Sequence, residues 1–163
     1  MKILGIDPGL TGSGYGCVES RGREFYKLYT DTAAPSPKMP LPQRLAALRN
    51  HTLEVLAAVK PEFVAVETLF SHAEHPKTGL QMAQARGVIL EACAAAGMAV
   101  KEYAPRRVKQ AVVGAGGASK EQVFRMVIRH LELKEEPATQ HEADALALAL
   151  CAHFVLGRPA AAK

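Results

Sequence analysis

Apolar and polar residues alternate along the chain in a pattern that predicts an α/β protein. Strand-like runs extend from Met1 to Asp7, near Tyr15 to Glu19, and from Glu24 to Thr30, with glycine-rich or polar turns between them. Two more strands are expected, one ending at Glu67 and one from Met98 to Tyr103. Because the first three strands follow one another directly, they predict a meander at one part of the sheet.

Helical spacing of apolar residues occupies much of the remaining sequence. Leucines at this spacing predict a helix from Gln43 to Val59, and a longer helix is expected from about Thr78 to Ala96, stopped by Gly97. Pro105 opens a basic helical segment, and residues 114–118 are expected to form a flexible glycine connector.

Two capping-box patterns predict where the last two helices begin. Ser119 with Gln122 forms the first, and Thr139 with Glu142 forms the second, so the final helix is expected over about 140–156. The resulting element order, βββαβαβ followed by helices, predicts an α/β fold with a mixed five-stranded sheet flanked by helices.

Length and composition agree with one compact domain. The chain has 163 residues, whereas chains usually divide only beyond about 250. We expect a single domain over residues 1–156 and a disordered tail over 157–163. The net charge of +4 is a mild basic bias that suits an anionic partner, although an ordinary basic protein has the same balance.

Cysteines and the amino-terminal segment indicate the compartment. Cys17, Cys93 and Cys151 are odd in number and form no CxxC pair, which indicates core residues in a reducing environment. The chain enters its first strand without a signal-like segment, and no apolar run approaches the roughly 18 residues of a membrane span. We therefore expect a cytoplasmic protein with no membrane partner.

Four side chains able to bind metal fall where the predicted fold would bring them together. Asp7 and Glu67 each follow an apolar strand, so both are expected at the carboxyl edge of a parallel pair, where open α/β sheets bind ligands. His141 and Asp144 share one face of the last helix. Such a set can hold two divalent cations about 3.5–4 Å apart, which activate water and stabilise the leaving oxygen of a phosphodiester.

Each of these residues also has an ordinary explanation by itself. Asp7 can start a turn, Glu67 can be a solvated strand end, and His141 can be a first-turn helix residue. Asp144 is harder to explain in this way, because apolar residues surround it and an unpaired carboxylate there costs roughly several kcal/mol. A cationic group is therefore expected opposite Asp144.

The glycine-rich segments suggest other functions, but each lacks a required feature. The glycines between 9 and 16 do not spell GxGxxG, and no βαβ unit follows them. Residues 7–11 resemble the first phosphate loop of actin-like ATPases and sugar kinases, which need two such domains where this chain has room for one. Residues 114–120 lack a glycine directly before Lys120 and follow no strand, so a P-loop is not indicated.

Basic and aromatic residues near the expected site suit a nucleic-acid partner. Basic side chains hold DNA phosphates in register. A solvated helix face can have the same basic composition. The basic residues in question are Arg106, Arg107, Lys109 and Lys120. Phe70 lies in the polar loop after the fourth strand, where an aromatic residue is more often a core anchor.

Five segments spread over the whole sequence share one resemblance: MKILGIDPGLTGSGYG, VAVETLF, GLQMAQARGVILEA, YAPRRVKQAVVGAGGASKEQV and HEADALALAL. In this order they closely resemble the RuvC family of Holliday junction resolvases. The resemblance implies a ribonuclease H-like fold, a homodimer, and Mg²⁺-dependent paired nicking of four-way DNA junctions, with branch-migration proteins of the RuvA and RuvB type as partners.

The resemblance also implies roles for the acidic set. Asp7, Glu67 and Asp144 match the catalytic acids, which would hold two Mg²⁺ ions per active site. The fourth position is commonly Asp in the family and is His141 here. Because imidazole is a softer ligand than carboxylate, Mn²⁺ is expected to substitute for Mg²⁺.

The same resemblance assigns DNA contacts and an assembly. Lys109 and Lys120 would lie near the scissile strand, and Phe70 would be a base-stacking wedge worth about 1–3 kcal/mol per base. The long helix carries two apolar stripes, one for the sheet and one with small residues for either a second chain or the same domain. A homodimer is expected, since a twofold interface matches a twofold junction.

Two other functions would use the same motifs. A related ribonuclease H-like nuclease would cut RNA or RNA–DNA hybrids in preference to branched DNA. An architectural protein would bind branched DNA without cutting it, and the intact acidic set argues against that alternative. We expect a junction-resolving endonuclease that acts in homologous recombination and DNA repair.

Overall fold

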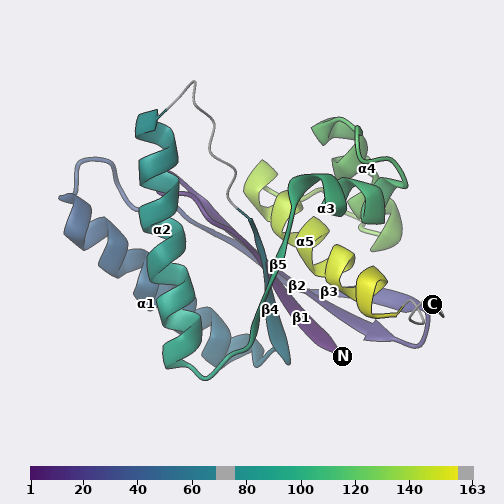
Figure 1. The fold of residues 1–163 in the computed structure, drawn as a ribbon. Coiled ribbons are helices and arrows are strands. Elements are labelled where there is room, and N and C mark those ends of the chain that lie inside the picture. Colours follow the sequence, from purple (N-terminus) through teal and green to yellow (C-terminus); the bar gives the residue numbers. More distant parts are fainter. Residues whose placement is uncertain (69–75, 158–163) are drawn as a thin grey trace, which may run out of the picture.

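A computed structural model describes residues 1–68 and 76–157 and shows a five-stranded sheet with helices on both faces (Figure 1). The strands lie in the order β3-β2-β1-β4-β5. β1 is antiparallel to β2, which is antiparallel to β3, while β1, β4 and β5 are parallel. The predicted mixed five-stranded sheet is therefore confirmed, with these bounds: β1 Lys2–Asp7, β2 Ser13–Arg21, β3 Glu24–Ala33, β4 Phe63–Glu67 and β5 Val100–Tyr103.

The parallel pairing places two of the predicted site residues side by side. Ile6 of β1 pairs with Val66 of β4, so the following residues, Asp7 and Glu67, both lie at the carboxyl edge of the sheet. The central strands are buried on both faces because helices cover both, which explains their unbroken apolar runs.

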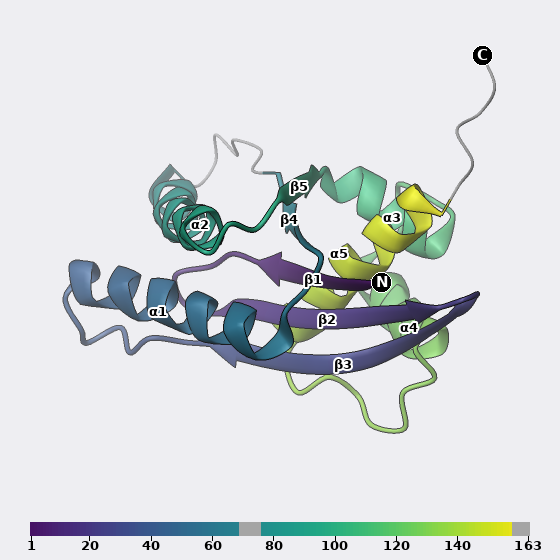
Figure 2. The same cartoon turned by 90° about the horizontal axis from the view of Figure 1, so that it is seen from below.

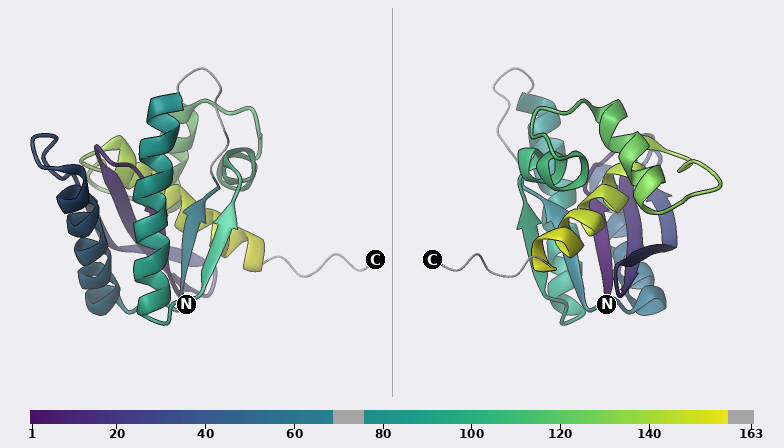
Figure 3. Two further views of the ribbon diagram at one scale, coloured as in Figure 1. Left: turned by 60° about the vertical axis from the view of Figure 1, so that its left-hand side comes forward. Right: turned by 90° about the vertical axis from the view of Figure 1, so that its right-hand side faces the viewer.

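Two layers of helices cover the sheet (Figures 1 and 3). On one face, α1 (Leu41–Val59) and α2 (Pro76–Ala95) pack over a cluster that includes Leu4 and Ile6. On the other face, α5 (Gln140–Leu156) lies across the strands, with α3 (Pro105–Val113) and α4 (Lys120–His130) packed on it.

The element bounds differ from the expected ones chiefly at β2 and β3. Both strands are longer than predicted and form an extended hairpin (Figure 2). β3 is an edge strand with β2 as its one neighbour. Its polar end from Thr30 to Thr32 therefore pairs with β2 although it lacks the apolar pattern that predicts a buried strand. β5 begins at Val100, two residues later than expected, and α1 begins at Leu41 with proline in its first turn.

Both helix caps are present, with one difference from the expectation. Ser119 and Gln122 form the predicted reciprocal box. Thr139 caps α5 by accepting from the Glu142 backbone N–H at 3.1 Å, but the Glu142 side chain accepts from the Ala138 N–H at 3.2 Å instead of from Thr139. The second capping box is thus half confirmed.

The start of the glycine connector after α3 is hydrogen-bonded to that helix, and the expected flexibility of the segment stays a prediction. Gly114 ends α3 with a φ of 91°, in the left-handed region that favours glycine. The Gln110 side chain donates to the Gly114 carbonyl and accepts from the Gly116 N–H at 3.0 Å. Two hydrogen bonds therefore tie residues 114–116 to α3.

Glycines in β1 and β2 bring α5 directly onto the sheet. A Cβ atom at Gly5 would lie 1.9 Å from the Ala145 carbonyl oxygen, and one at Gly14 would lie 2.0 Å from the His141 carbonyl oxygen. The helix backbone therefore occupies the space that side chains would fill. This close approach fixes the height of the first turns of α5 above the strand ends.

Other expectations concern the cysteines, the membrane and the tail. The three cysteines are buried and unpaired, as expected of core residues. Within residues 1–68 and 76–157, no helix combines the length and apolarity that a membrane crossing requires. The predicted disordered tail, apart from Gly157, lies outside the described residues.

Candidate active site

Three carboxylates predicted from separate parts of the sequence line one cavity of about 250 Å³. Asp7 and Glu67 reach it from the ends of β1 and β4, and Asp144 reaches it from the second turn of α5. Lys109 and Lys120 complete the polar part of its wall, while the remaining lining is apolar. The structure therefore brings together Asp7, Glu67, Asp144 and both predicted lysines.

The electrostatics of the cavity are dominated by its carboxylates. Burial raises the pKa of Glu67 to about 7, and the neighbouring charges of Asp7 and Asp144 add to this effect. Lys120 and Lys109 act in the opposite direction. Burial also raises the pKa of Asp144. A cation placed among these groups would relieve their mutual repulsion.

Asp144 has the cationic partner that its apolar surroundings predicted. The Lys120 ammonium lies 3.5 Å from Asp144 Oδ2, and the Gln140 amide donates to Asp144 Oδ1 at 2.8 Å. The contact from Gln140 was not predicted, although a residue four positions before Asp144 on a helix lies on the same face and could have indicated it. These two contacts orient the carboxylate toward the cavity.

His141 lies beside the cavity and contacts Asp7. Its Nδ1 donates to Asp7 Oδ2 at 2.8 Å, and this hydrogen bond is the main cause of a raised His141 pKa. The side chain is 44% exposed, compared with 15% for Asp7. In this geometry His141 orients Asp7, and binding a metal through Nδ1 would require the imidazole to leave that carboxylate.

The donor set fits a divalent cation by its chemistry. Among the described residues, no group of three His, Cys, Asp or Glu side chains lies close enough together to bind one metal ion. Asp7, Glu67 and Asp144 nevertheless line one cavity, where burial and the charges of Asp7 and Asp144 raise the pKa of Glu67. Carboxylate oxygens are the ligands that Mg²⁺ prefers. These three residues would hold it.

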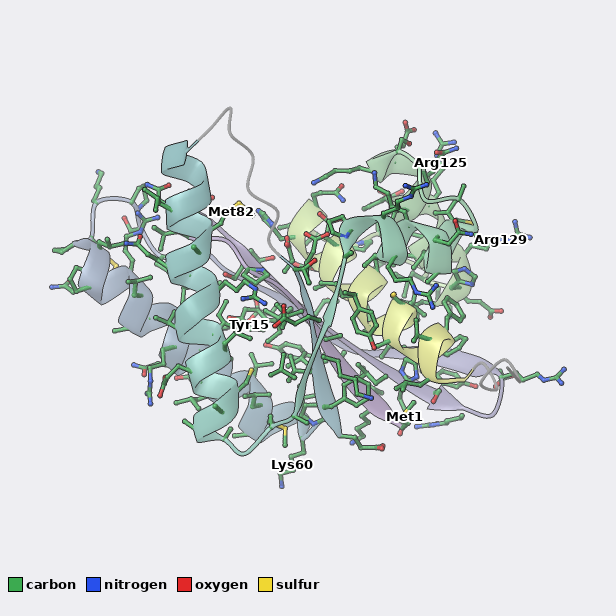
Figure 4. All side chains as sticks on the ribbon, in the orientation of Figure 1. Met1, Tyr15, Lys60, Met82, Arg125 and Arg129 are labelled. Carbon is green, nitrogen blue, oxygen red and sulfur yellow. The ribbon has the colours of Figure 1, made fainter. Side chains whose placement is uncertain are left out.

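The other predicted DNA contacts are placed less centrally. Arg106 and Arg107 are exposed at the start of α3 and are absent from the cavity lining, and the Arg106 side chain packs over Gly116. Phe70 lies outside the described residues. Arg125 and Arg129, which were not predicted as contacts, project outward from α4 away from the sheet (Figure 4).

The raised pKa of Glu67 predicts that glutamine at this position stabilises the metal-free protein at alkaline pH. The unfolded carboxyl titrates near 4.5 and the folded one at about 7, so the charged form costs stability increasingly as pH rises between these values. In EDTA at pH 8, Glu67→Gln should melt higher than the wild type by roughly a few degrees, and the difference should vanish near pH 4.5. A variant that melts lower than the wild type at pH 8 would contradict the electrostatic account.

The chain is similar to known proteins over most of its length. The family model described as crossover junction endodeoxyribonuclease RuvC matches residues 3–153. A crossover junction endodeoxyribonuclease RuvC of Moorella thermoacetica is 47% identical over 152 residues, covering 93% of this chain and 90% of that protein.

Two solved structures agree over nearly the whole chain. Thermus thermophilus RuvC is 40% identical with a TM-score of 0.87, covering 96% of this chain and 95% of that one. T. thermophilus RuvC in complex with a Holliday junction substrate is 39% identical with a TM-score of 0.89, covering 96% and 94%.

Proposed function

This chain belongs to the RuvC family of crossover junction endodeoxyribonucleases, and from that premise we propose that it resolves four-way DNA junctions by paired symmetric nicks. The observation that carries the proposal is the cavity at the sheet edge, which is lined by three carboxylates and two lysines. A related structure holds a Holliday junction substrate, which supports four-way DNA as the substrate of this chain.

The proposed chemistry is hydrolysis of a phosphodiester at this cavity. Two Mg²⁺ ions, with Mn²⁺ as a substitute, would supply a nucleophilic hydroxide and stabilise the leaving 3′ oxygen. Asp7, Glu67 and Asp144 would hold these ions, and His141 would orient Asp7 or join the ligand set. Glu67 must be ionised to bind a cation, so its raised pKa favours activity above neutral pH.

Lys109 and Lys120 would hold the scissile phosphate. Both line the same cavity as the carboxylates, and lysine binds phosphate as a point charge. Lys120 lies 3.5 Å from Asp144, so a phosphate at this place would share the ammonium with that carboxylate. Arg106 and Arg107, exposed on the adjoining first turn of α3, would contact the DNA backbone farther from the cut.

The exposed stripe of α2 supports a homodimer. Ala85, Ile89 and Cys93 are fully buried against the sheet, whereas Leu80 is 67% exposed and Ala83, Gly87 and Ala94 are also exposed. We assign this second stripe to a twofold contact with another copy of the chain, which would place two cavities on one junction. Branch-migration proteins of the RuvA and RuvB type would deliver the junction.

The dimer predicts a specific effect at Gly87. A Cβ there meets nothing within 4 Å in the single chain, so Gly87→Arg leaves the fold intact but blocks close approach of a second helix. Sedimentation should show a dimer for the wild type and a monomer for Gly87→Arg. The control is Ala95→Arg, an exposed position of α2 outside the stripe, which should remain dimeric. A Gly87→Arg protein that sediments as the wild type does would remove this interface.

Paired nicking is tested with a supercoiled plasmid that extrudes a cruciform. Coordinated cuts in both strands of one junction convert the plasmid directly to a linear form, whereas single cuts release an open circle. We expect linear product to accumulate without an open-circle intermediate when Mg²⁺ is present. An RNA–DNA hybrid cut faster than the cruciform would favour the ribonuclease alternative.

A further inference from the structure

One row of the sheet runs directly beneath the first turn of α5. Asp7 in β1 pairs with Gly14 in β2, and Gly14 pairs with Thr32 in β3. The row therefore has a carboxylate at one end, a hydroxyl at the other, and no side chain between them. The His141 carbonyl of α5 occupies the space above Gly14.

The first turn of α5 is bound to this row at both ends. At one end, His141 donates to Asp7 at 2.8 Å. At the other end, the Thr32 hydroxyl lies 2.7 Å from the Thr139 hydroxyl and donates to Glu142 Oε1 at 3.4 Å. The two attachments lie on opposite sides of Gly14, so together they fix the rotation of the turn about the helix axis.

Glu142 is a fourth carboxylate close in sequence to the cavity residues, but its side chain has other partners. It lies between His141 and Asp144 in sequence, yet it is 7% exposed and is absent from the cavity lining. Its second oxygen accepts from the Ala138 N–H at 3.2 Å, so both oxygens are used within this arrangement. Glu142 therefore joins the Thr32 end of the row to the segment entering α5.

We propose that Thr32, Thr139 and Glu142 form a latch that positions the metal ligands of α5, a role that rests on the proposed function. The body of α5 is held by the apolar residues that follow Glu142, which are buried against the sheet or against α3 and α4. The latch acts on the first turn, which carries His141 and leads directly into Asp144. Releasing it loosens the placement of both side chains, while the rest of the helix stays packed.

The test separates placement of the ligands from folding. Thr32→Val keeps the shape of the side chain and removes the hydroxyl, and Thr32→Ser restores it. Thr30→Val is the matched control, because Thr30 lies two residues earlier on the same face of β3 and makes no side-chain hydrogen bond within the described residues. Glu142→Gln is a second variant, which retains one acceptor oxygen and loses the other.

Binding of Mn²⁺ to the DNA-free protein is measured by titration calorimetry, together with the cleavage rate of bound junction. For Thr32→Val we expect the Mn²⁺ dissociation constant to rise about tenfold and cleavage at limiting metal to fall similarly, with junction affinity unchanged. Glu142→Gln should shift in the same direction, and Thr32→Ser and Thr30→Val should match the wild type.

Three outcomes would overturn the latch. A Thr32→Val protein that binds Mn²⁺ and cleaves the junction as the wild type does would show that the Thr32 hydroxyl does not position the metal ligands. Equal losses in Thr32→Val and Thr30→Val would indicate a general effect on β3. A wild-type protein that neither binds Mn²⁺ nor cuts a junction would overturn the proposed function and the latch together, which distinguishes that failure from the first two.

Discussion

Replacing Glu67 by glutamine is expected to abolish cleavage of a bound four-way junction while leaving its binding intact. The carboxylate lies with Asp7 and Asp144 in one cavity, and its charge is what attracts a divalent cation there. Each loss of roughly 1.4 kcal/mol of transition-state stabilisation lowers the rate tenfold. Losing the metal's contribution of several kcal/mol should therefore lower the cleavage rate about a thousandfold. Binding should persist, because lysines and arginines supply most of the attraction to phosphates.

The rate is measured in a single turnover with the junction bound before Mg²⁺ is added. Glu54→Gln is the control, since it makes the same chemical change at an exposed position of α1 away from the cavity. Glu67→Gln should also melt higher than the wild type at pH 8, so one substitution is expected to raise stability and remove activity. Glu67→Gln and wild type cutting at similar rates would remove this cavity as the active site.

Adding one methyl group at Gly5 is expected to disrupt both the fold and the site. The Cβ of an alanine would lie 1.9 Å from the Ala145 carbonyl oxygen, so α5 must lift away from the sheet. Asp144 directly precedes that residue and would leave the cavity. We expect Gly5→Ala to lose about 3 kcal/mol of unfolding free energy and nearly all cleavage.

Urea unfolding compares this variant with Gly79→Ala. Gly79 lies in α2, where a Cβ would meet nothing within 4 Å, so alanine there should add roughly 0.5–1 kcal/mol through its better helix propensity. Opposite signs for two identical substitutions would trace the loss at Gly5 to the contact with α5. A Gly5→Ala protein as stable as the wild type would show that α5 does not rest on β1.

The elements of the fold could be predicted because their signals are local. Apolar runs identified β1 and β4, and the acids that follow them marked the sheet edge at Asp7 and Glu67. The cation opposite Asp144 followed from the cost of burying a charge, and Lys120 fills that place. Each of these inferences needs only a short window of sequence or one general rule.

Contacts between distant elements could not be predicted in the same way. The glycines between 9 and 16 form no dinucleotide-binding motif, and nothing local in the sequence indicates that Gly14, in β2, admits the backbone of α5. Thr32 and Thr139 are separated by 107 positions, and nothing local marks them as partners. The Gly14 contact and the Thr32–Thr139 hydrogen bond together place the first turn of α5, where His141 bonds to Asp7. The sequence therefore predicted a shared site for these two residues but not the bond between them.

Cleavage of a synthetic four-way junction, compared with a linear duplex of the same sequence, tests the central claim most directly. Both substrates are incubated with the wild-type protein in Mg²⁺ and in EDTA, and the labelled products are separated under denaturing conditions. We predict nicks at symmetric positions in two opposing strands of the junction, only in Mg²⁺, with the duplex left intact. Equal cutting of the duplex, or junction cutting that persists in EDTA, would contradict a metal-dependent junction-resolving endonuclease.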